Sequence, residues 1–205
     1  QWVDPVTAKT ADVINPATEE VSGRIALGSK ADVDLAVAAA RRAFASWSQT
    51  SVKERLDLLL SIQAEYARRQ QELGEAVTEE MGAPIGLGCG FHVGLGAGHL
   101  HTAIEVLREF KFEEQRGVTM ILKEPIGVCG LITPWNWPLN QVTVKMFPAL
   151  ATGCTSVLKP PQLAPYSAKI LAEIMHDAGT TEGVFNMIQG QGSVIGTALS
   201  THPDV

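Results

Sequence analysis

The fold of this chain is decided by one stretch, GVCGLITPWNWP, which runs from Gly127 to Pro138. Its first half is short and apolar, as in a buried strand. Proline fixes φ and cannot donate a hydrogen bond to a sheet, so Pro134 ends the strand in a stiff turn. Residues 139–151 then follow a helical pattern. A strand, a turn and a helix place Asn136 at the carboxyl edge of a sheet, where α/β proteins bind ligands; a rigid packed corner without function is the alternative interpretation.

Strands and helices alternate from this stretch onward. We expect strands at 127–132, 156–159 and 184–188, and helices at 139–151, at 165–178 and from Ser193. This alternation predicts right-handed βαβ units and a parallel sheet, and the short apolar strands predict that helices cover both faces. Residues 202–205 have the pattern of the start of a further strand. The fold class is therefore α/β, with a parallel sheet and flanking helices.

The N-terminal part is predicted to form short strands followed by helices. The strands lie on either side of a turn at 15–18. Ser29 with Asp32, and Ser51 with Glu54, have the spacing of a capping box and predict two helix starts. The second of these helices is expected to bury Leu56, Leu59, Leu60 and Tyr66.

A third helix at 72–81 is predicted to end at Gly82, the first of seven glycines between Gly82 and Gly98. Glycine costs a helix roughly 1 kcal/mol relative to alanine, so a helix here would depend on tertiary packing. No Gly-Lys-Ser/Thr follows, so a phosphate-binding P-loop is rejected, and close approach of another helix is the preferred interpretation. His99 and His101 lie on opposite sides of a helix and make a weak metal pair.

The helical pattern continues to Phe110 and changes to strands over 111–124, with a turn at Arg116 and Gly117. An extended hairpin of this kind has few core contacts of its own. It is predicted to pair with another subunit, because a free strand edge offers unpaired backbone groups.

Composition and charge argue against several classes of function. The 205 residues are 45% apolar and 19% charged, as in ordinary globular proteins, and the net charge of −6 argues against a nucleic-acid partner. No apolar run is long enough to span a bilayer, and no signal peptide is visible in a chain that begins at Gln1. The cysteines Cys89, Cys129 and Cys154 are odd in number and lack metal-site spacing. In their apolar surroundings they indicate reduced thiols and a cytoplasmic location.

Three segments are predicted to meet at the carboxyl edge of the sheet, namely 133–136, 159–162 and 190–196. The third contains Gly-x-Gly-x-x-x-Gly between a strand and a helix. Glycines there let a backbone approach a cofactor, and the helix N-terminus attracts negative charge. Lys159 would hydrogen-bond a ribose or a phosphate. An ordinary loop and a solvated lysine at a strand end are the alternatives.

Six motifs then occur in order along the chain: Asn15-Pro16-Ala17-Thr18, Glu80-Met81-Gly82-Ala83-Pro84, Glu124-Pro125-Ile126-Gly127-Val128, Pro134-Trp135-Asn136-Trp137-Pro138, Ala151-Thr152-Gly153-Cys154-Thr155 and Leu158-Lys159-Pro160. With them, the whole chain resembles the amino-terminal, cofactor-binding part of the NAD(P)-dependent aldehyde dehydrogenase superfamily. The resemblance implies a Rossmann-type parallel sheet with flanking helices. It also implies N-terminal strands and helices over 1–110, an oligomerisation hairpin over 111–124 and an incomplete nucleotide-binding core over 125–205.

The same resemblance implies oxidation of an aldehyde to a carboxylic acid with NAD or NADP, through a thioester on a cysteine. Asn136 matches the asparagine whose amide donates to the oxyanion, a role that suits a neutral, preorganised donor. The residues that match the cofactor site are Ile132, Thr133, Pro134, Trp135, Lys159, Pro161, Gln162, Gly192 and Gly196. No metal site is implied, whereas a homodimer or homotetramer is. Met146 and the glycine-rich helix are expected to line the aldehyde tunnel.

Three departures from the family pattern matter, and one of them, the glycine-rich run at 86–98 in a segment that should be helical, has no functional interpretation. Gln162 stands where many relatives have glutamate, which repels a 2′-phosphate, so NADP should be tolerated better here. The nucleophilic cysteine and the glutamate base are expected beyond Val205, so the chain alone is expected to be inactive. Cys129 and Cys154 look structural, and Cys89 has no paired base in view. A non-catalytic nucleotide-binding or assembly module, or an inert fragment, is the alternative.

Overall fold

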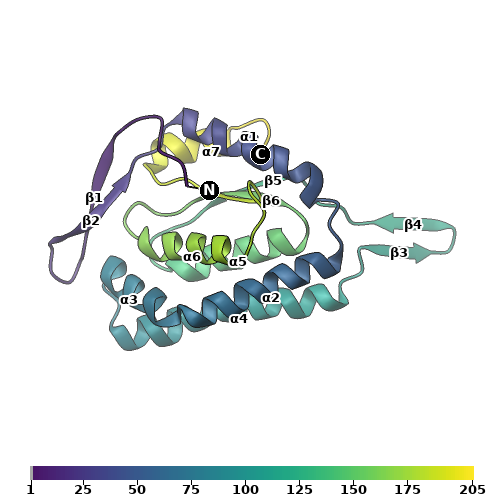
Figure 1. Cartoon of the computed structure of the whole chain (residues 1–205), viewed down its shortest axis with the longest axis horizontal. Coiled ribbons are helices and arrows are strands. Elements are labelled where there is room, and N and C mark those ends of the chain that lie inside the picture. The colour runs from purple at the N-terminus through teal and green to yellow at the C-terminus, as the bar shows by residue number, and fades with distance from the viewer. Residues whose placement is uncertain (1) are drawn as a thin grey trace.

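The computed structural model describes residues 2–205 and arranges helices on both sides of a small parallel sheet (Figure 1). The sheet has the order β5-β6-β7, with β5 (Val128–Ile132), β6 (Thr155–Lys159) and β7 (Phe185–Met187) all parallel. Ile132 lies opposite Lys159, so the carboxyl ends of these two strands meet at one edge. The predicted parallel sheet with flanking helices is confirmed.

Helices cover the two faces of the sheet as follows: α1 (Lys30–Trp47) and α7 (Thr197–Ser200) lie on one face, and α5 (Pro138–Ala151) and α6 (Tyr166–Asp177) lie on the other (Figure 1). All five residues of β6 are buried, which requires apolar contacts on both sides. Val157 packs with the cluster from α1 and α7, whereas Leu158 packs with the larger cluster that contains residues of α5 and α6. The two faces of one strand therefore hold the two helical layers together.

A further helical layer lies outside α5 and α6, and two antiparallel hairpins extend from the body (Figure 1). The layer consists of α2 (Val52–Arg68), α3 (Gln70–Met81), the π-helix η1 (Leu87–His92) and α4 (Val93–Glu109). The hairpins are β1 (Thr10–Ile14) with β2 (Val21–Ala26), and β3 (Glu113–Arg116) with β4 (Thr119–Leu122). No helix within residues 2–205 is both long enough and apolar enough to cross a membrane.

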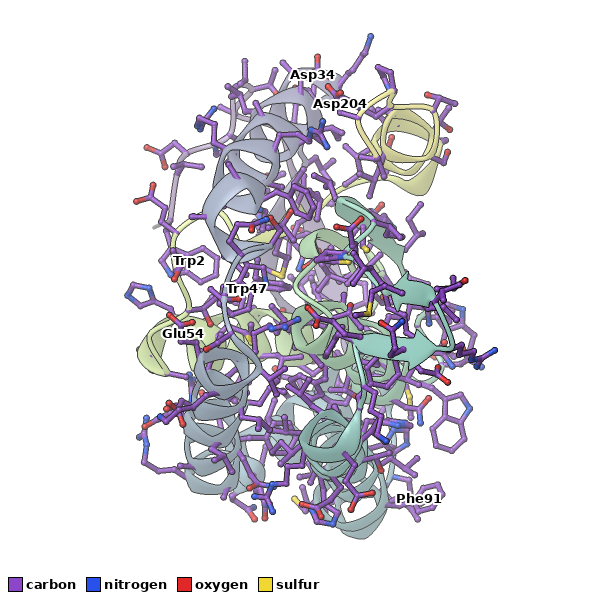
Figure 2. All side chains as sticks on the ribbon, turned by 90° about the vertical axis from the view of Figure 1, so that its right-hand side faces the viewer. Trp2, Asp34, Trp47, Glu54, Phe91 and Asp204 are labelled. Carbon is purple, nitrogen blue, oxygen red and sulfur yellow. The ribbon has the colours of Figure 1, made fainter. Side chains whose placement is uncertain are left out.

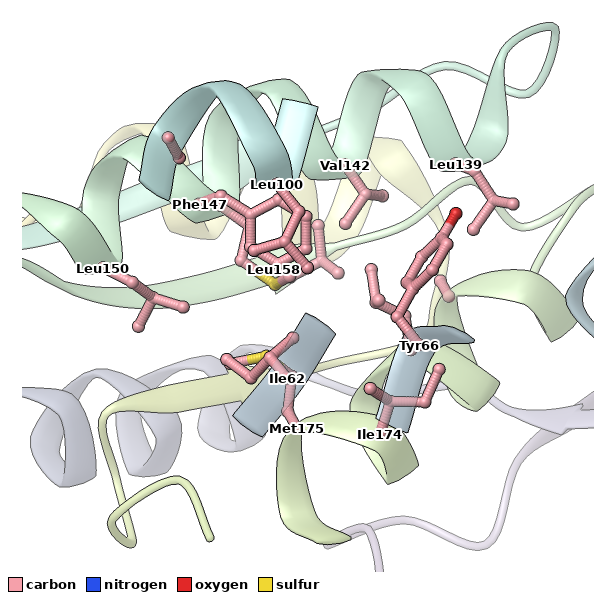
Figure 3. Packing of buried hydrophobic residues seen from close by; sticks show 14 of the residues in the cluster. Ile62, Tyr66, Leu100, Leu139, Val142, Phe147, Leu150, Leu158, Ile174 and Met175 are labelled. Atoms are coloured by element: carbon pink, nitrogen blue, oxygen red, sulfur yellow. The ribbon is translucent and has the colours of Figure 1, made fainter. Parts of the chain in front are cut away.

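The main core lies where α2, α4, α5, α6 and β6 converge, and Figure 3 shows side chains from these elements pointing toward one another. Tyr66 is fully buried in it and donates a hydrogen bond from its hydroxyl to the Val93 carbonyl at 2.9 Å. Side chains differ sharply in exposure within the helical layers: Trp47 lies inside, whereas Phe91 lies at the outer rim (Figure 2). Met146 has no exposed surface, so the expectation that it lines an aldehyde tunnel is wrong.

Capping residues set the helix starts as predicted. The backbone N–H of Ser29 donates to the Asp32 carboxylate at 2.7 Å, and the N–H of Ser51 donates to Glu54 at 2.7 Å. Helix α3 ends at Gly82, whose φ of 74° is in the left-handed region that favours glycine. Local sequence chemistry therefore fixes these helix ends.

The predicted buried face of α2 was partly wrong. Leu60 is 40% exposed, whereas Arg55 and Ile62 are buried on that helix together with Leu59 and Tyr66. The rotation of α2 is set by packing against α4, α5 and α6, and helical spacing alone does not fix it to within one residue.

Beyond Gly82, the glycine-rich segment is helical, and its six glycines from Gly86 to Gly98 fall into two groups. A Cβ atom on Gly88 would lie 2.6 Å from the Gly74 carbonyl oxygen on α3, and one on Gly96 would overlap the Tyr66 hydroxyl. These two glycines permit close helix packing, as predicted. The other group, Gly86, Gly90, Gly94 and Gly98, has nothing within 4 Å of an added Cβ, so close packing does not explain it.

Glu80 is a buried carboxylate that joins α3 to the start of α6. It accepts hydrogen bonds from the backbone N–H groups of Tyr166 and Ser167 and from the Ser167 hydroxyl. Burial raises the pKa of Glu80 to about 7, against the lowering effect of these donors. The motif at 80–84 thus acts in this chain as a cap for the N-terminus of another helix.

Candidate active site

The Pro-Trp-Asn-Trp-Pro corner is held at both ends by backbone hydrogen bonds. The N–H of Thr133 donates to the carbonyl of Lys159 at 3.3 Å, and the N–H of Gln141 donates to the carbonyl of Trp137 at 2.9 Å. Between these anchors, Asn136 is exposed, and its carboxamide makes no hydrogen bond with any residue of 2–205. The corner is therefore a rigid support for an amide that remains available to a ligand.

Aromatic contacts fix Trp137 against the π-helix η1. The His92 ring stacks on Trp137 with centroids 4.9 Å apart, and the Phe91 ring meets Trp137 edge-on at 5.6 Å. Burial lowers the pKa of His92, so its ring is held neutral. Sequence reasoning missed Phe91 and His92, because only the tertiary fold brings η1 next to the corner.

Lys159 is a buried cation at the carboxyl end of β6. The residue is 6% exposed, and burial lowers the pKa of its ammonium group. No ion pair or hydrogen bond to this ammonium is formed within residues 2–205. A Cβ atom on Gly192 would lie 3.9 Å from the Lys159 Nζ. The structure therefore brings Lys159 and Gly192, two of the predicted site residues, close together. It pairs the Lys159 ammonium with no anion from the described residues.

The turn after β7 leads into a single π-helical turn, η2 (Gly192–Gly196), and then into α7. The N–H groups of Val194 and Ile195 both donate to the Gln191 carbonyl, which closes this turn. Gly192 is exposed, and a Cβ on Gly196 would have nothing within 4 Å. The turn thus presents open backbone next to Lys159.

The remaining predicted cofactor residues divide by exposure. Ile132 and Trp135 are 43% and 54% exposed, and Pro134 is also exposed. Thr133 is buried, and its hydroxyl has no hydrogen-bond partner among the described residues.

The two residues that follow Lys159-Pro160 also differ. Pro161 is buried, so it would offer its backbone and not its ring, and Gln162 is half-buried. An ammonium group with no ion pair among the described residues, an unpaired buried hydroxyl and an open glycine turn together fit an anionic nucleotide with ribose hydroxyls.

Residues 2–205 contain no group of three or more His, Cys, Asp or Glu side chains that could hold a metal ion. His99 is bonded to the Asn140 amide at 3.0 Å, and His101 is exposed on another side of α4. His99 instead borders an apolar cavity of about 250 Å³ between α4 and α5, which also includes Val106, Val144 and Pro148.

The parallel sheet and the glycine turn after its third strand define a Rossmann-type α/β protein with a candidate nucleotide site at the sheet edge. A sequence model of the aldehyde dehydrogenase family matches residues 2–205. The chain belongs to the aldehyde dehydrogenase family.

Individual relatives agree with this assignment. The chain is 52% identical over 206 residues to the 3-succinoylsemialdehyde-pyridine dehydrogenase of a Pseudomonas species, and covers 100% of itself and 43% of that protein. It superimposes with a TM-score of 0.99 and 48% identity on a C291A mutant of aldehyde dehydrogenase C from Pseudomonas syringae in complex with NAD⁺ and octanal, covering 100% of itself and 42% of that chain. For betaine aldehyde dehydrogenase from Staphylococcus aureus in complex with NAD⁺, the TM-score is 0.95 with 32% identity, and the coverage is 100% and 42%. The chain thus spans less than half the length of these relatives.

Proposed function

We propose that this chain is the cofactor-binding part of an NAD(P)-dependent aldehyde dehydrogenase that oxidises an aldehyde to a carboxylic acid. The observation that carries the proposal is the unpaired Asn136 carboxamide on a rigid corner, at the same sheet edge as the unpaired Lys159 ammonium. The relatives with bound NAD⁺ support this choice of cofactor.

In this proposal Asn136 acts on the aldehyde oxygen. When a thiolate adds to the carbonyl carbon, negative charge develops on that oxygen, and the Asn136 N–H would donate to it. A neutral donor held by prolines on both sides needs no reorganisation as the charge appears. Trp137, fixed by His92, would keep the corner from shifting.

Lys159 would hydrogen-bond the ribose hydroxyls of the cofactor, which supplies the hydride acceptor when it is bound. Ile132, Thr133, Pro134 and Trp135 would form the wall along it, with Pro161 and Gln162 near the ribose and Gly192 and Gly196 under the phosphates. NAD and NADP are both candidates, because Gln162 carries no charge that would repel a 2′-phosphate.

The attacking cysteine and the general base would come from the part of the relatives that this chain does not span. Cys154 is buried and Cys129 lies within a strand, both near the amino ends of β5 and β6, away from Asn136. Neither therefore suits attack on an aldehyde at the carboxyl edge.

A homodimer or homotetramer, cytoplasmic in location, is part of the same proposal. The β3–β4 hairpin extends away from the body (Figure 1). Its side chains Val118, Met120 and Leu122 are exposed. Exposed apolar residues on an unpaired hairpin favour a protein partner.

Replacing Asn136 in the complete enzyme tests the proposal. Asn136→Ala should lower kcat by roughly a hundred- to a thousandfold, the loss measured for one oxyanion donor. Asn136→Asp keeps the shape and removes the donor, so it should lose at least as much. Full kcat in either variant would remove the oxyanion role. The 205-residue chain, assayed with an aldehyde and each cofactor, should bind a dinucleotide without turnover.

A further inference from the structure

The loop that follows β6 is tied by hydrogen bonds only at its two ends. At one end the N–H of Thr133 donates to the Lys159 carbonyl at 3.3 Å, and at the other end α6 begins at Tyr166. Between them, residues 160–164 make no hydrogen bond with any residue of 2–205. Three prolines with fixed φ angles stiffen the loop: Pro160, Pro161 and Pro165. A shift at the start of α6 would therefore be passed on to Gln162.

The α6 end of this loop is held by a carboxylate from another helix. Glu80 lies on α3 and is 3% exposed. One of its oxygens accepts from the backbone N–H groups of Tyr166 and Ser167, and the other accepts from the Ser167 hydroxyl. N–H groups in the first turn of a helix have no partner inside that helix. Glu80 therefore fixes the point at which α6 begins.

The same helix start is bonded to the segment that follows β7. The Gln189 side chain donates from Nε2 to the Pro165 carbonyl at 3.2 Å. Gln189 lies three residues before Gly192, where η2 begins. Both segments with candidate cofactor residues, 159–162 and 190–196, thus connect to the start of α6.

The carboxylate of Glu80 is surrounded by hydrogen-bond donors and not by cations. On α3 the neighbouring charged group is Glu79, which repels it. On α6 the nearby Lys169 pairs with a different carboxylate at 3.2 Å, and the Tyr166 hydroxyl is 3.0 Å from the Ser22 hydroxyl of β2. The three hydrogen bonds from α6 are thus the interactions that stabilise the charged form.

We propose that Glu80 is a positioning residue for the cofactor: by holding the start of α6, its carboxylate sets the positions of Gln162 and Lys159 at the ribose, without touching the ligand itself. This role rests on the proposed function. It gives a buried charge far from the candidate site an effect on nucleotide affinity.

The protonation state of Glu80 should then change that affinity. Burial raises the pKa of Glu80 to about 7. Hydrogen bonds to an ionised acceptor are roughly twice as strong as those between neutral groups. As the pH falls through this pKa, Glu80 gains a proton, its hold on α6 weakens and the affinity for the nucleotide should fall.

The pH dependence of NAD binding to the complete enzyme tests the proposal. From about pH 8 to about pH 6, the dissociation constant of the parent should rise roughly three- to tenfold, as for the loss of about one hydrogen bond. Glu80→Gln carries a neutral amide, so its dissociation constant should lie near the low-pH value of the parent at every pH. Ser167→Ala removes one donor and should give a smaller rise, with the pH dependence retained.

Glu79→Gln is the matched control, because Glu79 is exposed and directly precedes Glu80 on α3. It should bind NAD as the parent does. A Glu80→Gln variant that is less stable in chemical denaturation but keeps the parent's affinity and pH profile would show that Glu80 is only a helix cap. If Glu80→Gln does not fold, a flat pH profile in the parent overturns the role. A parent that binds no NAD would instead overturn the proposed function.

Discussion

A largely buried cation lies at each end of strand β6, namely Arg55 of α2 at the amino end and Lys159 at the carboxyl end. The chain provides hydrogen-bond partners for only one of them. At the amino end, Arg55 donates to the Ser51 and Ala151 carbonyls and lies 4.8 Å from the centre of the Phe112 ring. At the carboxyl end, Lys159 is buried to the same degree, but its ammonium has no hydrogen bond or ion pair with residues 2–205.

This difference supports the proposal that one end of the strand serves the structure and the other binds a ligand. A charge on a largely buried side chain is costly unless it is paired or hydrated, so a cation without a protein partner is suited to pair with a ligand. The Arg55 end is complete within the chain. In the proposed function, the nucleotide would supply the missing partner at the Lys159 end.

The largest expected effect comes from Lys159→Met. The dissociation constant for NAD should rise roughly ten- to a hundredfold, because a hydrogen bond to a charged group contributes about 1.5–3 kcal/mol. The free energy of unfolding should stay the same or rise, because an unpaired buried charge is removed. Titration calorimetry and chemical denaturation measure the two quantities.

Lys169→Met is the matched control for this substitution. The Lys169 side chain is 61% exposed and pairs with Glu173 on the surface at 3.2 Å, so its removal should change neither quantity. If both variants lost the same affinity for NAD, Lys159 would contribute only through the net charge of the protein. The proposed difference between the two strand ends would then be wrong.

Arg55→Met should give the opposite pattern with a smaller change. It leaves the Ala151 carbonyl unpaired and removes the contact with the Phe112 ring, so the free energy of unfolding should fall by about 2 kcal/mol. The dissociation constant for NAD should not change. Arg42→Met on the exposed side of α1 is the control. Weaker NAD binding in Arg55→Met, with stability unchanged, would reverse the assignment of the two ends.

The smallest effect is expected from Gln162→Glu, next to the Lys159 end. The ratio of kcat/KM for NADP to that for NAD in the complete enzyme should fall roughly fivefold, since two like charges a few Å apart in water repel by about 1 kcal/mol. Gln71→Glu on the surface of α3 adds the same charge elsewhere and should leave the ratio unchanged. An unaltered ratio in Gln162→Glu would mean that this side chain does not contact the ribose.

Local chemistry made much of the fold predictable from the sequence. The serine–carboxylate pairs at Ser29 and Ser51 fixed two helix starts, and the alternation of apolar strands with helices fixed a parallel sheet. Pro134 and Pro138 placed Asn136 beyond the end of a strand, where the structure has it. These signals act over a few residues and need no knowledge of the tertiary packing.

Features that depend on long-range packing were not predictable in the same way. The burial of Arg55 and the exposure of Leu60 depend on the rotation of α2 against three other helices. Met146 faces the core because of the rotation of α5, and His92 reaches Trp137 only because η1 packs beside the corner. The roles of the site residues remain predictions.

The open glycines of α4 have a practical consequence for protein engineering. An added methyl group at Gly94 or Gly98, and at Gly90 in η1, would meet no atom within 4 Å, and each glycine costs its helix about 1 kcal/mol relative to alanine. The helix forms nonetheless, because its opposite side is anchored by Leu100, Ile104 and the Tyr66 hydroxyl. Heat resistance could therefore be raised in this chain by alanine substitutions on one outer surface, without altering the sheet.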